Sequence, residues 1–167
     1  MKTLNLPSYR FTIKEENKKT KIFDAIRKKF LVLTPEEWVR QHIVRFLIEE
    51  KGFPANLIAL ERGLKLNGLQ KRTDILVYSK SGQPILMVEC KAPSIKIDQQ
   101  VFDQIGRYNI TFKLPYLLIT NGMEHFCAKV DFINKNNIGQ TVIAAYEFYN
   151  SIEIEPYEKV VNYKFKK

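Results

Sequence analysis

The sequence predicts an α/β protein in which a mixed β-sheet is flanked by helices, and three observations support this fold class. Residues 34–52 and 97–112 each carry apolar side chains at helical spacing. Three short apolar or alternating segments lie between these helices, and two more follow the second one. The order of helix, three strands, helix and two strands is typical of helices packed on a mixed sheet. A chain of 167 residues is long enough to form one such domain around its own core.

The two ends of the chain carry its excess positive charge. Residues 9–24 alternate apolar and polar side chains, which predicts a β-hairpin with its turn near residues 15–17. Residues 1–33 contain nine Lys and Arg against three Asp and Glu, residues 158–167 contain four against one, and residues 34–157 contain fourteen of each. We therefore expect an N-terminal basic hairpin or arm at 1–33, a domain at 34–157 and a basic C-terminal tail at 158–167. Basic arms can neutralise phosphates, but solvated ends that only aid solubility have the same composition.

The helix at residues 34–52 has the clearest boundaries. Thr34 is suited to cap its N-terminus, Pro35 suits the first helical position, and Glu37 completes a capping box with Thr34. Gly52 ends the pattern. These signals predict one amphipathic helix with a single apolar stripe, formed by Val39, Ile43, Phe46 and Leu47.

The remaining segments supply the strands and the second helix. Gly63 is expected to mark a β-bulge in the strand that follows the first helix. Asp98 is suited to cap the second helix. The predicted strands are residues 56–66, the two arms of a hairpin at 72–90, and residues 115–122 and 124–130.

The hairpin at residues 72–90 carries charged residues where its strands are otherwise apolar. Its turn is predicted at residues 81–82, and a loop of two or four residues pairs positions whose numbers sum to 163. Asp74 then lies directly across from Glu89, on one face of the sheet. Lys91, two residues further on, projects from the same face. A three-residue loop would shift this register by one position.

Two directly opposed carboxylates repel each other unless a cation lies between them. Oxygen ligands of this kind, with water completing the shell, suit Mg²⁺ or Mn²⁺. A lysine alongside can hold a water molecule or a scissile phosphate, so Asp74, Glu89 and Lys91 together predict metal-assisted phosphodiester hydrolysis. The alternative is that Asp74 and Glu89 are ordinary strand-end residues whose charge Lys91 neutralises.

The pattern of Asp74 followed by Glu89-Cys90-Lys91 after an apolar strand resembles the PD-(D/E)XK nuclease superfamily. The segments "PEEWVRQ", "RTDILVY", "PILMVECKAPS", "FDQIGRYN" and "PYLLITNG" are similar to the N-terminal nuclease domain of type I restriction enzyme R subunits. This resemblance implies a restriction-endonuclease-like αβββαβ core with a central mixed sheet flanked by helices. It also implies DNA as the substrate and Mg²⁺, or Mn²⁺, as the cofactor.

The resemblance implies roles for the residues of the motif. Asp74 and Glu89 would bind the metal together with the backbone carbonyl of Cys90. Lys91 would position the attacking water or stabilise the charge that develops on the phosphate.

Both helices contribute to the implied site. The segment "DQIGRY" gives the Q-x-x-x-Y pattern of RecB-type members, so Gln104 and Tyr108 would orient the substrate or the metal shell. The superfamily often has a third acid at the start of the upstream helix. Glu36 leans towards the core side of that helix and is our first choice, with Glu37 as the alternative. Either acid also suits the positive N-terminus of a helix without any role in a site.

The chain departs from the type I pattern in two ways. Thr73 stands where the motif has proline, and the phosphate-binding motif G-x-x-x-x-G-K-[ST] of a motor is absent from this sequence. We therefore expect a metal-dependent DNA endonuclease that has no motor. DNA and a larger restriction or defence complex are the expected partners, and a homodimer is also compatible with the sequence. The alternative function is a catalytically silent module of the same fold that binds nucleic acid or docks on a complex.

The remaining features indicate a cytoplasmic protein. Cys90 and Cys127 are expected to be buried free thiols, which is typical of a reducing compartment. No apolar run is long enough for a membrane span, and the N-terminus does not resemble a signal peptide. His42 and His125 have no neighbouring His or Cys at a zinc-binding spacing.

Overall fold

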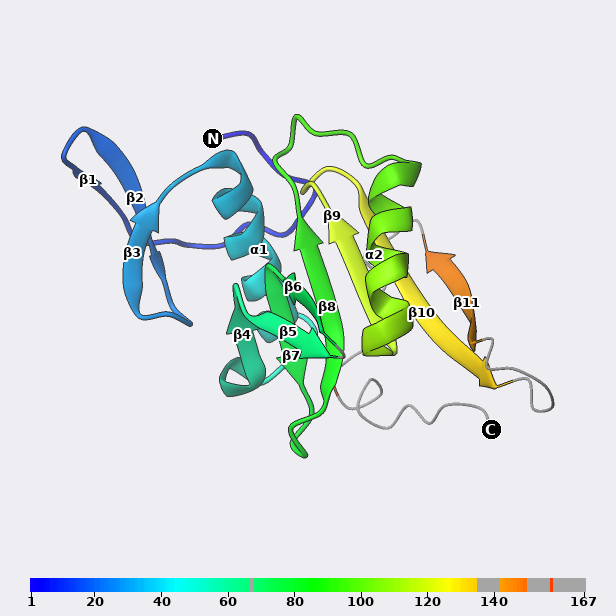
Figure 1. Ribbon diagram of the computed structural model, residues 1–167. Coiled ribbons are helices and arrows are strands. Elements are labelled where there is room, and N and C mark those ends of the chain that lie inside the picture. The colour runs from blue at the N-terminus through cyan, green and yellow to red at the C-terminus, as the bar shows by residue number, and fades with distance from the viewer. Residues whose placement is uncertain (67, 135–141, 150–156, 158–167) are drawn as a thin grey trace.

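The computed structural model describes residues 1–66, 68–134, 142–149 and 157 (Figure 1). Its helices are α1 (Pro35–Glu49), the short 3₁₀ helix η1 (Ala55–Leu57) and α2 (Gln99–Phe112). Its strands are β1 (Ile13–Glu16), β2 (Lys19–Asp24), β3 (Lys29–Val32), β4 (Ile58–Leu60), β5 (Gly63–Leu66), β6 (Leu69–Arg72), β7 (Ile75–Tyr78), β8 (Pro84–Cys90), β9 (Tyr116–Thr120), β10 (His125–Asn134) and β11 (Val142–Tyr149).

The central sheet has the strand order β11-β10-β9-β8-β7-β4. β8 and β9 run parallel, and the other neighbours run antiparallel, so the sheet is mixed as predicted. A parallel pair needs a crossover connection, which α2 supplies between β8 and β9. Figure 1 shows α2 packed across one face of this sheet. The succession α1, β4, β7, β8, α2, β9 is the expected αβββαβ core.

Each face of the central sheet buries its own hydrophobic core. Ile75 and Val77 of β7 belong to one cluster, together with the predicted apolar stripe of α1. Leu76, which lies between them, belongs to a second cluster with Ile105 of α2. Successive side chains of a strand point to opposite faces. The uninterrupted apolar runs of β7 and β8 therefore serve both cores, as expected for strands covered on both sides.

The N-terminal segment forms a separate three-stranded sheet, β1-β2-β3. Asn17 and Lys18 form the β1–β2 turn with left-handed φ values of 52° and 59°. Two such residues give the type I′ turn that matches the twist of a hairpin. The hairpin predicted within residues 9–24 is therefore confirmed, and β3 adds a third strand to it. The predicted tail at 158–167 lies outside the described residues.

Residues 56–66 do not form one strand, so this prediction is wrong. β4 belongs to the central sheet, whereas β5 pairs with β6 in a separate two-stranded sheet. Between them Glu61 adopts a left-handed φ of 51°, and its carboxylate pairs with Arg27 and Arg72. The chain therefore changes direction at Glu61, which is held by these two ion pairs and by a third with Arg40, and Gly63 is the first residue of a new strand.

Both cysteines are buried free thiols, as predicted. Burial raises the pKa of the Cys127 thiol to about 12, so this group is uncharged at neutral pH. Among the described helices, none is both long enough and apolar enough to cross a membrane.

Candidate active site

The β7–β8 hairpin has the predicted register near Asp74 and Glu89, but it also contains an irregularity that the sequence did not indicate. Ile75 lies opposite Val88, so the paired numbers sum to 163 as expected. Nearer the turn, Tyr78 lies opposite Pro84, which is a shift of one position, so the predicted loop of two or four residues is wrong and the loop has three residues, 80–82. Ile85 is the extra residue between these two registers. A β-bulge at Ile85 therefore cancels the one-residue shift at the loop. Beyond the bulge, the strands have the register that was predicted to place Asp74 opposite Glu89.

Asp74 immediately precedes β7 and ties the hairpin together through its side chain. Its Oδ2 accepts a hydrogen bond of 2.7 Å from the backbone N–H of Cys90, and its Oδ1 accepts one of 3.2 Å from Arg40 Nη2. Burial raises the pKa of Asp74; the Cys90 N–H opposes this effect, and the negative charge of Glu89 adds to it. Asp74 and Glu89 thus interact electrostatically, which is what the predicted register requires.

Glu89 and Lys91 lie at the end of β8 beside Asp74. Glu89 is buried, and its Oε1 accepts a hydrogen bond of 3.0 Å from Lys91 Nζ. Burial disfavours the charge of Lys91, but its bond to Glu89 and the charges of the surrounding acids outweigh burial and raise the pKa of Lys91. Lys91 is therefore a cation throughout the neutral range. The predicted placement of Lys91 on the face of Glu89 is confirmed.

The backbone carbonyl of Cys90 also faces this region. A residue in a strand directs its N–H and its C=O to the same side. Because the Cys90 N–H points to Asp74 Oδ2, the Cys90 carbonyl is turned towards the Asp74 side of β8. An uncharged oxygen donor is thus added to the carboxylates.

The two candidate acids of α1 differ in their surroundings. Glu37 is buried, and its carboxylate pairs with Arg40 and Arg27. The side chain of Glu36 is 45% exposed, so it does not lean towards the core as predicted, and its Oε1 lies 3.4 Å from Arg40 Nη2. Burial raises the pKa of Glu36, and the charge of Asp74 raises it further. Glu36 is therefore the α1 acid that is coupled to the acids of the hairpin, whereas Glu37 belongs to an internal ion-pair network.

The predicted capping box at the start of α1 is only half formed. Thr34 Oγ1 accepts a hydrogen bond of 3.0 Å from the backbone N–H of Glu37, as predicted. The backbone N–H of Thr34, however, donates to the Val32 carbonyl over 3.1 Å. The Glu37 carboxylate accepts bonds from Gln41 Nε2 at 2.7 Å and Arg27 Nη2 at 3.1 Å instead. The Glu37 carboxylate therefore bonds to Gln41 and Arg27 and does not return to the helix N-terminus.

Arg40 is a residue of this site that the sequence analysis missed. Its side chain is 6% exposed, and burial disfavours its charge, but the surrounding acids outweigh burial and raise its pKa. The only sequence signal was its position, one turn after the two acids that begin α1. The carboxylates within ion-pair distance of its guanidinium are those of Asp74 (3.2 Å), Glu36 (3.4 Å), Glu61 (3.6 Å) and Glu37.

A chain of polar contacts joins this site to the N-terminal sheet. Asp24, the last residue of β2, is fully buried. Its Oδ2 accepts hydrogen bonds from Arg27 Nε at 2.6 Å and from Gln41 Nε2 at 3.1 Å. Arg27 in turn pairs with Glu37, which pairs with Arg40. The β2–β3 turn is therefore connected to the acids of the hairpin through buried side chains.

Gln104 and Tyr108 lie one turn apart on α2. Together with Gln100 and Arg107 they line a polar pocket of about 570 Å³. The acids predicted for the site are not among the residues that line this pocket. The structure thus gathers Asp74, Glu89, Lys91 and Glu36, and it places Gln104 and Tyr108 beside a pocket of their own.

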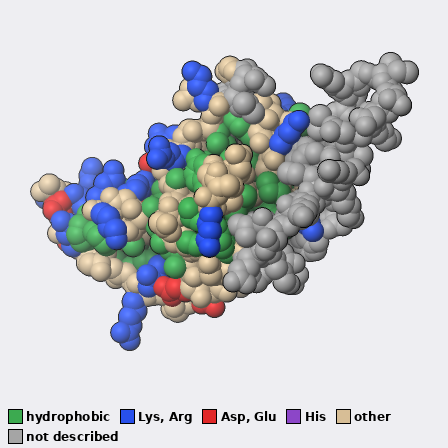
Figure 2. Space-filling view, turned by 90° about the horizontal axis from the view of Figure 1, so that it is seen from below, with side chains coloured by type: hydrophobic (Ala, Val, Ile, Leu, Met, Phe, Trp, Pro, Cys, Tyr) green, Lys and Arg blue, Asp and Glu red, His purple; other side chains and the backbone are tan. Residues whose placement is uncertain are grey.

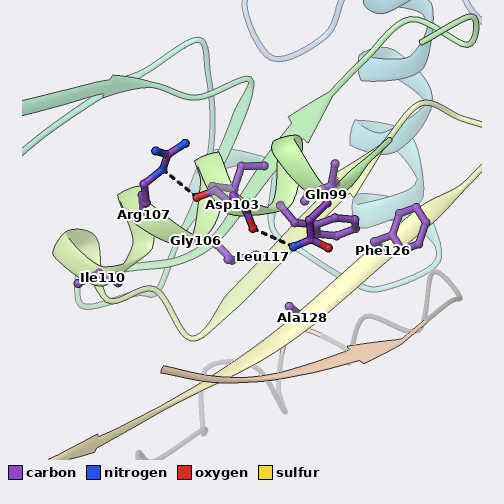
Figure 3. Close-up of a pocket in the computed structure, with 11 residues that line it drawn as sticks. Gln99, Asp103, Gly106, Arg107, Ile110, Leu117, Phe126 and Ala128 are labelled. Carbon is purple, nitrogen blue, oxygen red and sulfur yellow. Dashed lines mark hydrogen bonds between the residues drawn. The ribbon is translucent and has the colours of Figure 1, made fainter. Parts of the chain in front are cut away.

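A second pocket, of about 510 Å³, lies between α2 and the face formed by β9 and β10 (Figure 3). Phe102 and Phe126 line it, with ring centroids 5.1 Å apart. Gln99 Nε2 donates a hydrogen bond of 2.8 Å to Asp103 Oδ1 at its rim. None of the residues predicted for the site lines this pocket. It is mainly apolar and reflects the packing of α2 on the sheet.

The donor set of the hairpin end fits a hard divalent cation. Asp74, Glu89 and Glu36 supply carboxylate oxygens, and Cys90 supplies a carbonyl oxygen. Burial is the largest cause of the raised pKa values of Asp74 and Glu36; the charge of Glu89 adds to the first and the charge of Asp74 to the second, so a cation beside these acids would stabilise their charged forms. Mg²⁺ is usually held by one or two carboxylates, with water and substrate phosphates completing its shell.

Two cationic side chains already contact these acids. Arg40 bonds to Asp74 and Lys91 bonds to Glu89. Within the described part of the chain, no group of three or more His, Cys, Asp or Glu side chains is arranged to hold a metal ion. The arrangement therefore suits a metal held by two carboxylates better than one enclosed entirely by protein ligands.

Comparisons with known proteins identify the family. Residues 35–144 match the family described as type I restriction enzyme R protein N terminus. The structure is similar to that of a candidate nuclease belonging to DUF820 from Anabaena variabilis, with 11% identity, a TM-score of 0.45 and coverage of 84% of this chain and 82% of that chain. That structural likeness is too weak to carry an argument, and no curated protein matches the chain. Because the family match spans more than half of the sequence, the chain belongs to the family of type I restriction enzyme R protein N-terminal domains.

Proposed function

We propose that the protein is a metal-dependent endonuclease that hydrolyses phosphodiester bonds of DNA. The observation that carries the proposal is the convergence of Asp74, Glu89, Glu36 and Lys91 at one end of the β7–β8 hairpin. Membership of a restriction-enzyme R protein family supports nuclease chemistry and a DNA substrate. We also propose that it acts within a larger restriction complex in the cytoplasm; the family membership supports the complex.

Each residue has a role that its surroundings favour. Asp74 and Glu89, aided by the Cys90 carbonyl, would hold Mg²⁺ or Mn²⁺, and Glu36 would add a ligand or a bound water. The bound ion would polarise the scissile phosphate and lower the pKa of a coordinated water. Lys91 is protonated at neutral pH, so it acts as a hydrogen-bond donor to phosphate or water and not as a general base.

A catalytically silent DNA-binding module is the second candidate, and one observation favours it. Arg40 and Lys91 already supply counter-charges to Asp74 and Glu89. The carboxylates are therefore tolerated without a metal ion. For this second candidate, the protein binds DNA or a larger complex without cleaving DNA, and the acids only stabilise the structure.

A cleavage assay separates the two candidates. Supercoiled plasmid and single-stranded circular DNA are incubated with the purified protein and Mg²⁺ or Mn²⁺, with EDTA as the blank. Wild-type protein should cleave at least one substrate, and Glu89→Gln and Lys91→Ala should each reduce the rate by about a hundredfold or more. Glu124→Gln and Lys80→Ala, which change exposed residues of the same types, serve as matched controls.

The outcomes are distinct. Equal activity in Glu89→Gln, Lys91→Ala and wild type would exclude these residues as the source of cleavage. Wild-type protein that binds DNA but cleaves neither substrate would favour the silent module.

A further inference from the structure

The N-terminal sheet has one face turned towards α1 and one face turned away. Ile22 and Asp24 of β2 are fully buried, and Asp24 bonds to Gln41 of α1, so side chains of this parity face the helix. Phe23 lies between them and points to the opposite face, because side chains alternate along a strand. Phe30 is the cross-strand partner of Phe23, so it shares this outward face.

Two aromatic rings stand at the centre of the outward face. The rings of Phe23 and Phe30 have centroids 5.2 Å apart and an interplanar angle of 61°. Both side chains are partly exposed, and neither belongs to the two cores of the central sheet. Val32, in the same row, is 44% exposed. These apolar groups are not needed to fill a core, so their place on an open sheet face calls for another role.

Lysine side chains surround this aromatic pair. Glu16, on the same face, pairs with Lys14 and Lys21. Lys14 Nζ also lies 4.3 Å from the centroid of the Phe30 ring. Figure 2 shows Lys and Arg side chains gathered around hydrophobic ones at the left, where this sheet lies. The lysines of the outward face and of its turn are Lys14, Lys18, Lys19 and Lys21.

Two of these lysines have their charges available. Lys18 and Lys19, at the β1–β2 turn, form no ion pair with any described residue. The segment from residue 13 to residue 32 holds seven Lys and Arg against three Asp and Glu. The face thus combines partly exposed rings with an excess of positive charge.

We propose that the outward face of β1–β3 binds single-stranded nucleic acid, with bases stacked on Phe23 and Phe30 and phosphates held by the lysines. Stacking platforms flanked by cations are the usual means of binding single strands. A duplex keeps its bases stacked inside and would offer this face only phosphates. The positive charge around the rings favours a polyanion over a protein partner. The site lies on another sheet from the hairpin acids, and its binding does not depend on cleavage.

The test is a binding titration in EDTA, where no metal-dependent cleavage takes place. Fluorescence anisotropy measures the affinity of the full chain for oligothymidylate and for a duplex of equal length. The variants are Phe23→Leu with Phe30→Leu, which removes the rings but keeps apolar volume, and Lys18→Gln with Lys19→Gln. Phe112→Leu and Lys113→Gln, which lie at the end of α2, are the matched controls.

The double Phe variant should bind oligothymidylate at least about fivefold more weakly, with a much smaller effect on the duplex. The double Lys variant should flatten the dependence of log affinity on log salt by about 0.7 per lost contact on the single strand. Equal affinities in wild type and both variants overturn the proposal. A change in self-association of the Phe variant without a loss of oligothymidylate affinity also overturns it, because the face is then a protein interface. If the Phe variant fails to fold, the double Lys variant tests the proposal alone. A salt dependence of its oligothymidylate affinity equal to that of wild type then overturns the proposal.

Discussion

Arg40 neutralises the acids of the site from inside the protein. Its guanidinium lies between acids of α1, the Glu61 turn and Asp74, and its side chain is 6% exposed. Buried ion pairs contribute little net stability as pairs, but removal of one member leaves a buried charge without compensation. Arg40 is thus a structural counter-ion for the site as well as a neighbour of any bound metal.

Replacement of Arg40 should therefore be costly. Arg40→Ala leaves the buried carboxylate of Glu37 and that of Asp74 without their shared cation, so the free energy of unfolding should fall by about 3–5 kcal/mol. Urea denaturation measures this loss. Arg45→Ala, in the same helix, removes an exposed pair with Glu49 and should cost less than about 1 kcal/mol. Equal losses in the two variants would contradict the internal role of Arg40.

The raised pKa values of Glu36 and Asp74 give the metal-free protein a characteristic pH dependence. A carboxyl group whose pKa is raised by folding contributes stability that is complete below its unfolded pKa and is lost as pH rises through its folded pKa. Wild type should therefore gain stability relative to Glu36→Gln as pH falls from neutral towards the ordinary value of 4.5. Denaturation in EDTA at several pH values measures this difference.

Glu16 provides a control of opposite sign. Its hydrogen bonds with Lys14 and Lys21 lower the pKa of Glu16 to about 2. Its contribution is present above the ordinary value of 4.5 and is lost as pH falls below it. Wild type should therefore lose stability relative to Glu16→Gln in acid. If the stability difference from wild type changed with pH in the same direction for Glu36→Gln and Glu16→Gln, the pKa of Glu36 would not be raised by its surroundings.

At the residue scale, the sequence was sufficient to predict the acids of the site but not Arg40, their counter-ion. Asp74, Glu89 and Lys91 were predictable because strand periodicity and a register place them on one face. Arg40 was not, since an arginine on a helix is usually exposed and its burial depends on tertiary neighbours. The ion pair of the Glu37 carboxylate could not be predicted for the same reason, because its partner Arg27 lies in another element.

At the scale of elements, the β2–β3 turn anchors the N-terminal sheet on α1. The carboxylate of Asp24 is fully buried and accepts bonds from Arg27, from Gln41 and from the backbone of the turn. Asp24→Ala removes the acceptor of Arg27 Nε and of the backbone N–H groups of Ile26 and Arg27, while Gln41 Nε2 keeps its bond to Glu37. Each buried donor left without an acceptor costs about 1–3 kcal/mol. The N-terminal sheet should loosen before the central sheet does.

Hydrogen exchange measures this loosening. In Asp24→Ala the backbone amides of β1–β3 should exchange faster, while those of β8 and β9 should keep their protection. Glu15→Ala, which removes an exposed acid of β1, is the control and should leave both regions unchanged. Protection of β1–β3 that equals wild type in Asp24→Ala would mean that this anchor is not needed.

The elements that sequence analysis missed share one cause. The two helices and the β7–β8 hairpin carry strong local signals, such as the Thr34 cap and the Asp98 cap, and both caps are formed. The separation of β4 from β5 depends on Glu61, whose left-handed turn is held by arginines from distant segments. The bulge at Ile85 corrects the register only in combination with the loop beside it. Neither feature is visible in a window of neighbouring residues.

At the scale of the whole molecule, two parts with different chemistry are joined. The central sheet and its helices correspond to most of the family match at residues 35–144, and they carry the acids. The N-terminal sheet precedes that match and carries lysines and partly exposed rings. The contacts of Asp24 and Arg27 hold this sheet beside α1. In the proposed function, single-strand binding and cleavage therefore take place on neighbouring but separate surfaces.

Thermal unfolding in the presence of metal tests the central claim, that Asp74 and Glu89 hold a divalent cation, without any need for a substrate. At ~10 mM Mg²⁺ and an assumed Kd of ~1 mM, binding stabilises the native state by about 1.4 kcal/mol. This corresponds to a rise of roughly 3–6 °C in Tm for a chain of this size. Wild type should show this rise with Mg²⁺ and with Mn²⁺ relative to EDTA, while Asp74→Asn and Glu89→Gln should lose most of it. Equal shifts in wild type and both variants, or no shift in any of them, would contradict the claim that these two carboxylates bind a metal ion.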